Sequence, residues 1–215
     1  MQLFLILFFI LLSITAAGQD ASRFQEEILE IQKKYDTLWD NSKETIVFTG
    51  SSSIRLWKDL HESFPKHQIV NSGFGGSQAS DLLAYTNELI LQYNPGKVFI
   101  YEGDNDINDN KRPKEVISVF KEIISKIKDA KPETLIVIIS AKPSLARWHL
   151  KRKYKSINRR FNRLCKKEPY LDYANIWNIM LDKKKLRQDI FIEDGLHLNS
   201  KGYELWDQII SNYIQ

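Results

Sequence analysis

The chain has 215 residues, of which 43% are hydrophobic and 27% charged, and its formal net charge is +4. This length and composition suit one globular domain with a full hydrophobic core, and the charge is too small to indicate a nucleic-acid-binding protein. No repeat of about 20–50 residues and no low-complexity linker divides the chain, which excludes a repeat array and favours a single domain.

The first 18 residues have the pattern of an export signal. Leu3 to Leu12 is continuously apolar, and the small residues from Ser13 to Gly18 follow it, as a signal peptidase requires. The apolar run is shorter than the ~20 residues that span a bilayer, and no cysteine follows it for lipid attachment. The run has no Lys or Arg before it, which departs from the usual pattern. We interpret residues 1–18 as a signal peptide, cleaved to leave Gly18 or Gln19 first, rather than as an uncleaved anchor. The mature domain then spans residues 19–215 in the periplasm or outside the cell.

Helical and strand patterns alternate along the rest of the chain. Helical spacing of apolar residues predicts helices over about 22–39, 54–60, 80–93, 113–130, 147–167 and 199–213. Apolar, β-branched runs predict strands over 45–49, 68–71, 97–102, 134–140 and 170–175. Such alternation indicates a parallel sheet with helices on both faces and right-handed connections. The run over 134–140 is the most apolar, so we expect it at the centre of the sheet and covered on both faces.

The chain is organised around the stretch that runs from Thr45 to Trp57. A predicted strand breaks at Gly50 into Ser51, Ser52 and Ser53, and helical spacing then resumes. In open α/β folds, such a turn lies at the carboxyl end of the sheet, where it combines a hydroxyl with free N–H groups of a helix N-terminus. A serine in this position can attack an acyl carbon, although serines before a helix more often serve only as caps.

Three further polar segments are expected at or near the same edge. They are the glycine-rich loop 73–77, the segment 103–106 with Asn105, and the segment 193–199 with Asp194 and His197. Together they supply a nucleophile, oxyanion donors, a base and a carboxylate that orients it. Each one alone has a plain structural alternative, because Asp and Asn are common in turns and glycines allow tight packing.

Two other site chemistries are disfavoured by spacing. The glycine loop has Gln78 where a dinucleotide fingerprint needs its third glycine. His197 has no second histidine at metal-ligand spacing. We therefore expect no metal and no cofactor.

The four segments, in this order, resemble the SGNH hydrolase superfamily of GDSL-like lipases and acylhydrolases, and especially its platelet-activating-factor-acetylhydrolase-like branch. The resemblance runs from about Thr45 to Trp206. It rests on four blocks: Gly50-Ser51-Ser52, Asn71-Ser72-Gly73-Phe74-Gly75-Gly76, Gly103-Asp104-Asn105-Asp106 and Asp194-Gly195-Leu196-His197.

This resemblance implies a flavodoxin-like three-layer α/β/α sandwich with a mostly five-stranded parallel sheet. It implies a catalytic triad of Ser52, Asp194 and His197, and an oxyanion hole formed by Ser52, Gly76 and Asn105. The family has Asp where this chain has Ser51, and that difference puts the rigidity of the loop in question. Ser51 and Ser53 remain the alternative nucleophiles.

The function expected on this basis is a serine esterase that forms an acyl-enzyme on short acyl esters, with O-acetyl groups on carbohydrates foremost. No long lid or apolar insertion that could shelter a fatty chain is evident. The alternative is a non-catalytic protein on the same scaffold that binds glycans or anionic surfaces. A phosphate- or nucleotide-binding domain is disfavoured by the glycine pattern.

The segment from Arg147 to Lys167 is strongly basic and has no acidic residue. Its cations are Arg147, Lys151, Arg152, Lys153, Lys155, Arg159, Arg160, Arg163, Lys166 and Lys167. The simplest interpretation is a solvated helix face, and the sharper one is a surface for anionic glycans or lipid headgroups. Nucleic acid is disfavoured as a partner of an exported protein.

Three more residues have both a structural and a functional interpretation. Cys165 is the only cysteine, so no internal disulfide can form, and we interpret it as a core residue because no base accompanies it. Arg55 and Trp57 follow the serines closely and could line a substrate pocket, but Trp57 is better interpreted as packed in the core.

Overall fold

A computed structural model of the protein describes residues 20–214 and contains a five-stranded parallel sheet. Its strands are β1 (Thr45–Gly50), β2 (Gln68–Gly73), β3 (Lys97–Tyr101), β4 (Leu135–Ile139) and β5 (Leu171–Ala174). They are arranged in the order β2-β1-β3-β4-β5, and every neighbouring pair is parallel. The chain moves outward from β1 to β2 and then crosses to β3 on the other side. A reversal of this kind creates a crevice at the carboxyl ends of the strands.

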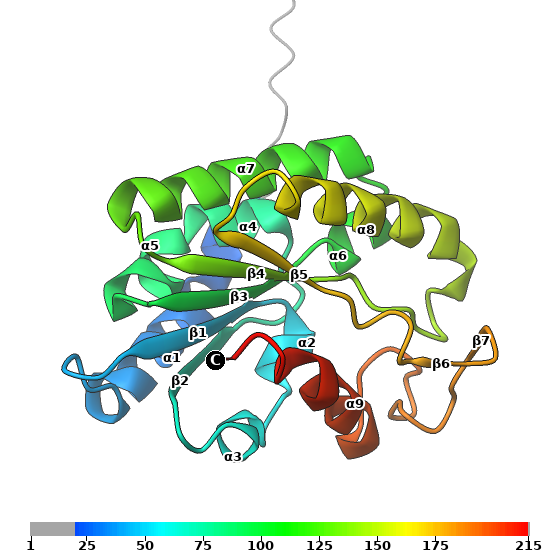
Figure 1. The fold of residues 1–215 in the computed structure, drawn as a ribbon, viewed down its shortest axis with the longest axis horizontal. Helices are drawn as coiled ribbons and strands as arrows, with labels where there is room; N and C mark the ends of the chain where they lie inside the picture. Colours follow the sequence, from blue (N-terminus) through cyan, green and yellow to red (C-terminus); the bar gives the residue numbers. More distant parts are fainter. Residues whose placement is uncertain (1–19, 215) are drawn as a thin grey trace, which may run out of the picture.

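Helices cover both faces of the sheet, as Figure 1 shows. One face packs against α1 (Gln25–Leu38), α4 (Ala79–Ala84), α5 (Thr86–Leu89), α7 (Pro113–Ala130) and α8 (Lys151–Cys165). The other face packs against α2 (Ser52–Arg55), α3 (Leu60–Ser63) and α9 (Ser200–Ile210). Neighbouring side chains of β1 show the alternation: Val47 lies in the first core and Phe48 in the second. The three-layer α/β/α fold predicted from the sequence is confirmed.

The most apolar strand is covered on both faces, as predicted, but it does not lie in the middle of the sheet. β3 occupies the middle of the sheet, whereas β4 lies one place in from the edge, between β3 and β5. Both strands are covered on their two faces, and residues 136–139 of β4 and all of β3 are buried. Hydrophobicity alone cannot distinguish two inner strands, because both are shielded to the same extent.

Two predicted helices are interrupted where side chains donate hydrogen bonds to backbone carbonyl oxygens. The helix expected over 54–60 ends at Arg55, where Asn71 Nδ2 donates to the carbonyl oxygen of Ile54 at 2.9 Å. The helix expected over 80–93 is split into α4, α5 and a short 3₁₀ turn (Leu91–Tyr93). Here Thr86 Oγ1 donates to the carbonyl of Leu82 at 2.9 Å. Side chains that compete for backbone groups in this way shorten helices.

Two small elements were not predicted. The segment after β3, expected as a loop, forms the short helix α6 (Asp104–Asn108). A two-stranded hairpin, β6 (Leu181–Asp182) and β7 (Lys185–Leu186), follows β5. Its turn residues Lys183 and Lys184 have φ of 42° and 73°, a conformation usually given to Asn or Gly, so the sequence carries no hairpin signal.

Several single-residue interpretations can be compared directly with the structure. Cys165 is buried in α8, and burial raises the pKa of its thiol to about 12. Trp57 is 1% exposed and packs against Trp206, so it belongs to the core as predicted. The predicted signal peptide lies outside the described residues. Within residues 20–214, no helix has the length and apolarity needed to cross a bilayer.

Candidate active site

The segments predicted to form the site lie together beyond the carboxyl ends of the strands. The helix α2 follows β1 directly and α6 follows β3, and both lie at the same end of the sheet in Figure 1. The Gly73–Ser77 loop follows β2, and the Asp194–His197 turn precedes α9. Parallel strands bring their following loops to one edge, so segments far apart in sequence become neighbours.

Gly50 makes the sharp turn between β1 and the serines. Its φ is +120°, and a Cβ there would lie 2.1 Å from the carbonyl oxygen of Tyr101. Only glycine combines this conformation with such a close approach of another backbone. The next N–H, that of Ser51, then donates to the same Tyr101 oxygen at 3.0 Å, which fixes where α2 starts.

Ser52, His197 and Asp194 form a continuous hydrogen-bonded chain. Ser52 Oγ lies 2.9 Å from His197 Nε2, and His197 Nδ1 lies 2.5 Å from Asp194 Oδ2. The second carboxylate oxygen, Oδ1, accepts the N–H groups of Leu196 at 2.8 Å and His197 at 2.9 Å. Burial by itself would raise the pKa of Asp194, but these donors outweigh it and hold that pKa below its usual value. An ionised Asp194 keeps the proton on Nδ1, which leaves Nε2 free to accept the Ser52 proton.

The turn that carries Asp194 and His197 is fixed at both ends. Phe191 and Leu198 pair across it as an antiparallel bridge, and the N–H of Ile192 donates to the His197 carbonyl at 3.0 Å. The following residue, Asn199, caps α9: its Oδ1 accepts the N–H of Gly202, and its Nδ2 donates to the Phe191 carbonyl. The cap at Asn199 thus ties the turn to the helix.

Of the three adjacent serines, only Ser52 contacts the histidine. Ser51 is 2% exposed, and its hydroxyl accepts a hydrogen bond from Asn105. Ser53 is 1% exposed, and its carbonyl oxygen accepts a hydrogen bond from the Tyr203 hydroxyl. The geometry therefore favours Ser52 over the two alternatives that the sequence left open.

The three predicted oxyanion donors are two backbone N–H groups and one side-chain amide. Among the described residues, the N–H groups of Ser52 and Gly76 donate to no acceptor. Gly76 has φ of +75° and is exposed, and a Cβ there would meet nothing within 4 Å, so its conformation rather than space requires glycine. Asn105 Nδ2 donates to Ser51 Oγ at 2.9 Å and to the Ser77 carbonyl at 2.8 Å. An incoming oxyanion would therefore compete with Ser51 for one amide hydrogen.

The chain is similar to a known family of proteins. The family model of GDSL-like lipases and acylhydrolases matches residues 14–205. The chain belongs to this family. It is accordingly a hydrolase that acts on carboxylic esters, as the order of the motifs predicted.

Solved structures of similar fold are numerous. A Streptococcus pneumoniae protein described as a platelet activating factor is 24% identical, with a TM-score of 0.78, over 90% of this chain and 95% of its own. A Bacteroides fragilis protein described as an acylhydrolase is 20% identical, with a TM-score of 0.73, over 92% of this chain and 97% of its own. A family 3 carbohydrate esterase of Clostridium thermocellum is 17% identical, with a TM-score of 0.65, over 79% and 94%. At these identities the likeness concerns the fold.

One curated relative matches this chain over only part of the relative's own length. An N-acylneuraminate cytidylyltransferase of Escherichia coli is 25% identical over 192 residues, which are 87% of this chain and 43% of that protein. The chain thus spans less than half the length of the relative that it matches.

A buried ionic cluster in this GDSL-type hydrolase supports Asn105, and sequence reasoning missed it. Arg147 Nη1 donates to Asn105 Oδ1 at 3.0 Å and to Asp104 Oδ1 at 2.5 Å. Lys142 Nζ lies 2.9 Å from Asp104 Oδ2, and the hydroxyl of Tyr154 donates to Asp104 Oδ1 at 2.7 Å. Burial would raise the pKa of Asp104, but Lys142 and Arg147 outweigh it and hold that pKa well below its usual range. The cationic partners of Asp104 lie 38 and 43 positions away in the sequence, so no local pattern indicates the cluster.

Two carboxyl groups hold the glycine-rich loop. Glu27 Oε1, on α1, accepts the N–H of Gly75 at 3.0 Å and pairs with Arg55 Nη1 at 3.1 Å. Below the loop, Ser77 Oγ donates to Glu102 Oε1 at 2.6 Å. Glu102 is fully buried beside Asp106, and burial first and this neighbour second raise its pKa well above the usual value. Glu102 is thus held as the neutral acid. No sequence pattern pointed to Glu27 or Glu102.

Among residues 20–214, no cluster of three or more His, Cys, Asp or Glu side chains has the arrangement of a metal site.

Proposed function

We propose that this protein is an exported serine esterase that removes short acyl groups, with O-acetyl groups on carbohydrates foremost. The observation that carries the proposal is the hydrogen-bonded chain from Ser52 through His197 to Asp194 at the carboxyl edge of the sheet. A hydroxyl, an imidazole and an ionised carboxylate in this order are the working parts of acyl transfer.

In the first half of the reaction, His197 Nε2 takes the Ser52 proton while Oγ attacks the ester carbonyl carbon. The negative charge that develops on the carbonyl oxygen is met by the N–H groups of Ser52 and Gly76 and by the Asn105 amide. The intermediate collapses, His197 returns the proton to the departing alcohol, and the acyl group stays on Ser52. Water then attacks this acyl-enzyme, with His197 again as the base, and the acid leaves.

The surroundings of the triad support a preference for short acyl groups. Leu145 and Ile192 are exposed at 39% and 48%, and Leu145 packs 3.0 Å from where a Cβ on Gly195 would be. These two side chains offer a small apolar edge beside the catalytic turn, enough for an acetyl or similar group. The carbohydrate esterase with the same fold is a further reason to place the ester on a sugar.

The decisive experiment compares Ser52→Ala with Ser53→Ala in p-nitrophenyl acetate hydrolysis and in labelling by a serine-directed phosphonate. We expect Ser52→Ala to lose the label and at least about 10⁴-fold in kcat, with only binding and oxyanion contributions left. Ser53→Ala, a neighbour without triad contacts, should keep both. Unchanged turnover in Ser52→Ala would sink the proposal. A wild-type protein without turnover or label on any short ester would favour the non-catalytic binding protein instead.

A further inference from the structure

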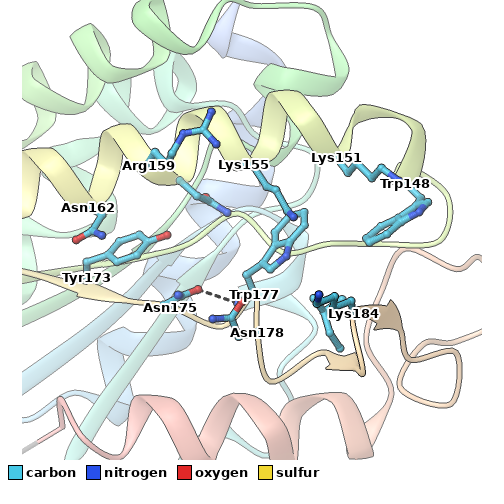
Figure 2. A pocket seen from close by; sticks show the side chains of 12 residues that line it. Trp148, Lys151, Lys155, Arg159, Asn162, Tyr173, Asn175, Trp177, Asn178 and Lys184 are labelled. Carbon is cyan, nitrogen blue, oxygen red and sulfur yellow. Dashed lines mark hydrogen bonds between the residues drawn. The ribbon is translucent and has the colours of Figure 1, made fainter.

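A second pocket, separate from the Ser52 site, opens between α8 and the segment 173–184. Its volume is about 560 Å³, and Figure 2 shows side chains of α8 facing those of the other wall across it. The pocket is connected to the catalytic centre through the chain itself. Arg147, which holds Asn105, is followed directly by Trp148, a wall residue of the pocket. Nothing in the acyl-transfer chemistry uses this pocket.

The pocket is lined by cations without counter-charges. Lys151, Lys155 and Arg159 come from α8 and Lys184 from the β6–β7 turn, and no acidic residue is among the described residues that line it. None of these four side chains makes an ion pair within residues 20–214. Uncompensated cations around a hollow attract an anion and give it charge-assisted hydrogen bonds.

A buried hydrogen-bond donor in the pocket wall also lacks an acceptor. Trp177 is 5% exposed, and its Nε1–H has no partner among the described residues. Buried polar groups in proteins are nearly always paired, so an unpaired indole N–H in a pocket indicates a place for a ligand oxygen. Lys155 Nζ lies over the face of the same ring, 5.7 Å from its centre, so a cation is part of the same wall.

The remaining wall residues suit a sugar better than a nucleobase. The rings of Trp148 and Trp177 are nearly parallel at 19°, with centres 6.3 Å apart, too close to admit a base stacked between both. Asn162 and Asn178 also line the pocket, and their side-chain amides bond no other described residue. An amide both donates and accepts, as is needed for sugar hydroxyls, and indole faces suit the apolar face of a sugar ring.

We propose that this pocket binds a carboxylate-bearing sugar unit of an acidic oligosaccharide, and that it holds the glycan whose acyl ester the Ser52 site cleaves. The second half of this proposal rests on the proposed function, whereas the first does not. The carboxylate pairs with Lys151 and Lys155, and an oxygen of the same unit accepts the Trp177 N–H. The basic residues of α8 then divide into two groups: those that line the pocket bind the acidic sugar, and the others are solvated.

The test measures binding to a hexamer of galacturonic acid and to its carboxyl-reduced galactose counterpart, by calorimetry, with the protein in the Ser52→Ala background. We expect the acidic hexamer to bind at least about tenfold more tightly and to lose affinity steeply with salt, since ionic strength screens its pairs with the lysines. The Lys151→Gln/Lys155→Gln variant should lose about tenfold or more for the acid. The matched variant Lys166→Gln/Lys167→Gln removes the same charge from exposed lysines at the other end of the basic segment, and should bind as the parent does.

Three results would overturn the proposal: equal affinity for the acidic and neutral hexamers, equal losses in the two double variants, or tighter binding of an oligothymidylate of equal charge. Because the ligand carries no ester and Ser52 is absent, binding can succeed even if p-nitrophenyl acetate hydrolysis fails in the wild type. That combination would leave a glycan-binding protein and refute only the esterase.

Discussion

At the scale of single residues, Asn105 is held through both ends of its side-chain amide. Its Nδ2 bonds Ser51 Oγ and the Ser77 carbonyl, and its Oδ1 accepts from Arg147. Ser51, which stands where the family has Asp, is therefore a contact of the oxyanion donor. The loop keeps a polar anchor at this position despite the substitution.

We expect Asn105→Ala to lower kcat by on the order of 10²–10³, because it removes a donor that acts on the developing oxyanion. KM should change much less. The measurement is steady-state hydrolysis of p-nitrophenyl acetate, with Asn108→Ala, an exposed residue on the same helix, as the control. Equal kcat in the two variants would exclude Asn105 from the oxyanion hole.

At the scale of elements, α1 holds the glycine-rich loop from outside the sheet. Glu27 accepts the N–H of Gly75, next to the oxyanion glycine, and pairs with Arg55 of α2. One carboxylate thus links α1, the loop after β2 and the helix that carries Ser52. This link is positional, because Glu27 contacts none of the three proposed triad residues.

Glu27→Gln should reduce kcat by about threefold to tenfold. This loss is smaller than the loss of a fully buried charged hydrogen bond would cause, because the Arg55 partner is half exposed and solvent screens the pair. Its neighbour Glu26 is exposed on the same helix, so Glu26→Gln removes the same charge as a control and should change nothing. The comparison uses kcat and KM for p-nitrophenyl acetate. A loss of the same size in Glu26→Gln would mean that the overall charge of α1, and not the Gly75 contact, is responsible.

At the scale of the whole molecule, buried acids make stability depend on pH. Glu102 keeps its proton in the folded state because burial raises its pKa well above 4.5. The unfolded chain loses that proton near 4.5, so folding stability from this residue is complete below that pH and falls as pH rises toward the folded value. Burial raises the pKa of Asp106 to about 6, so the folding stability from this residue also falls as pH rises from 3.8 to about 6. Asp104 acts oppositely, because its stabilising charge is lost only below pH 3.8.

Glu102→Gln mimics the neutral acid, so it should remove the loss of folding stability with rising pH that Glu102 causes. The variant and the wild type should unfold at similar temperatures at pH 4, and the variant several degrees higher at pH 8, since ~1 kcal/mol corresponds to about 2–4 °C at this size. Thermal unfolding at both pH values measures this, with Glu30→Gln, exposed on α1, as the control. A difference between variant and wild type that does not grow with pH would contradict the assignment.

The proposed export also belongs to the molecule as a whole. If residues 1–18 are a signal peptide, protein recovered outside the cytoplasm of an expressing cell should begin at Gly18 or Gln19. Mass spectrometry of the intact protein decides this. A chain that retains Met1 and stays with the membrane fraction would favour the uncleaved anchor.

The sequence by itself determined the alternation of strands and helices, the three-layer class and the four polar segments, because burial and turn chemistry leave local patterns. Only the tertiary structure decided which of Ser51, Ser52 and Ser53 meets His197. The close approach of Gly50 to Tyr101 sets the direction in which each of these serine side chains points. The tertiary structure also decided that Lys142 and Arg147 surround Asp104, and that α8 and the 173–184 segment enclose a pocket. Such contacts join residues tens of positions apart. They follow from the order of strands in the sheet, which no local pattern encodes.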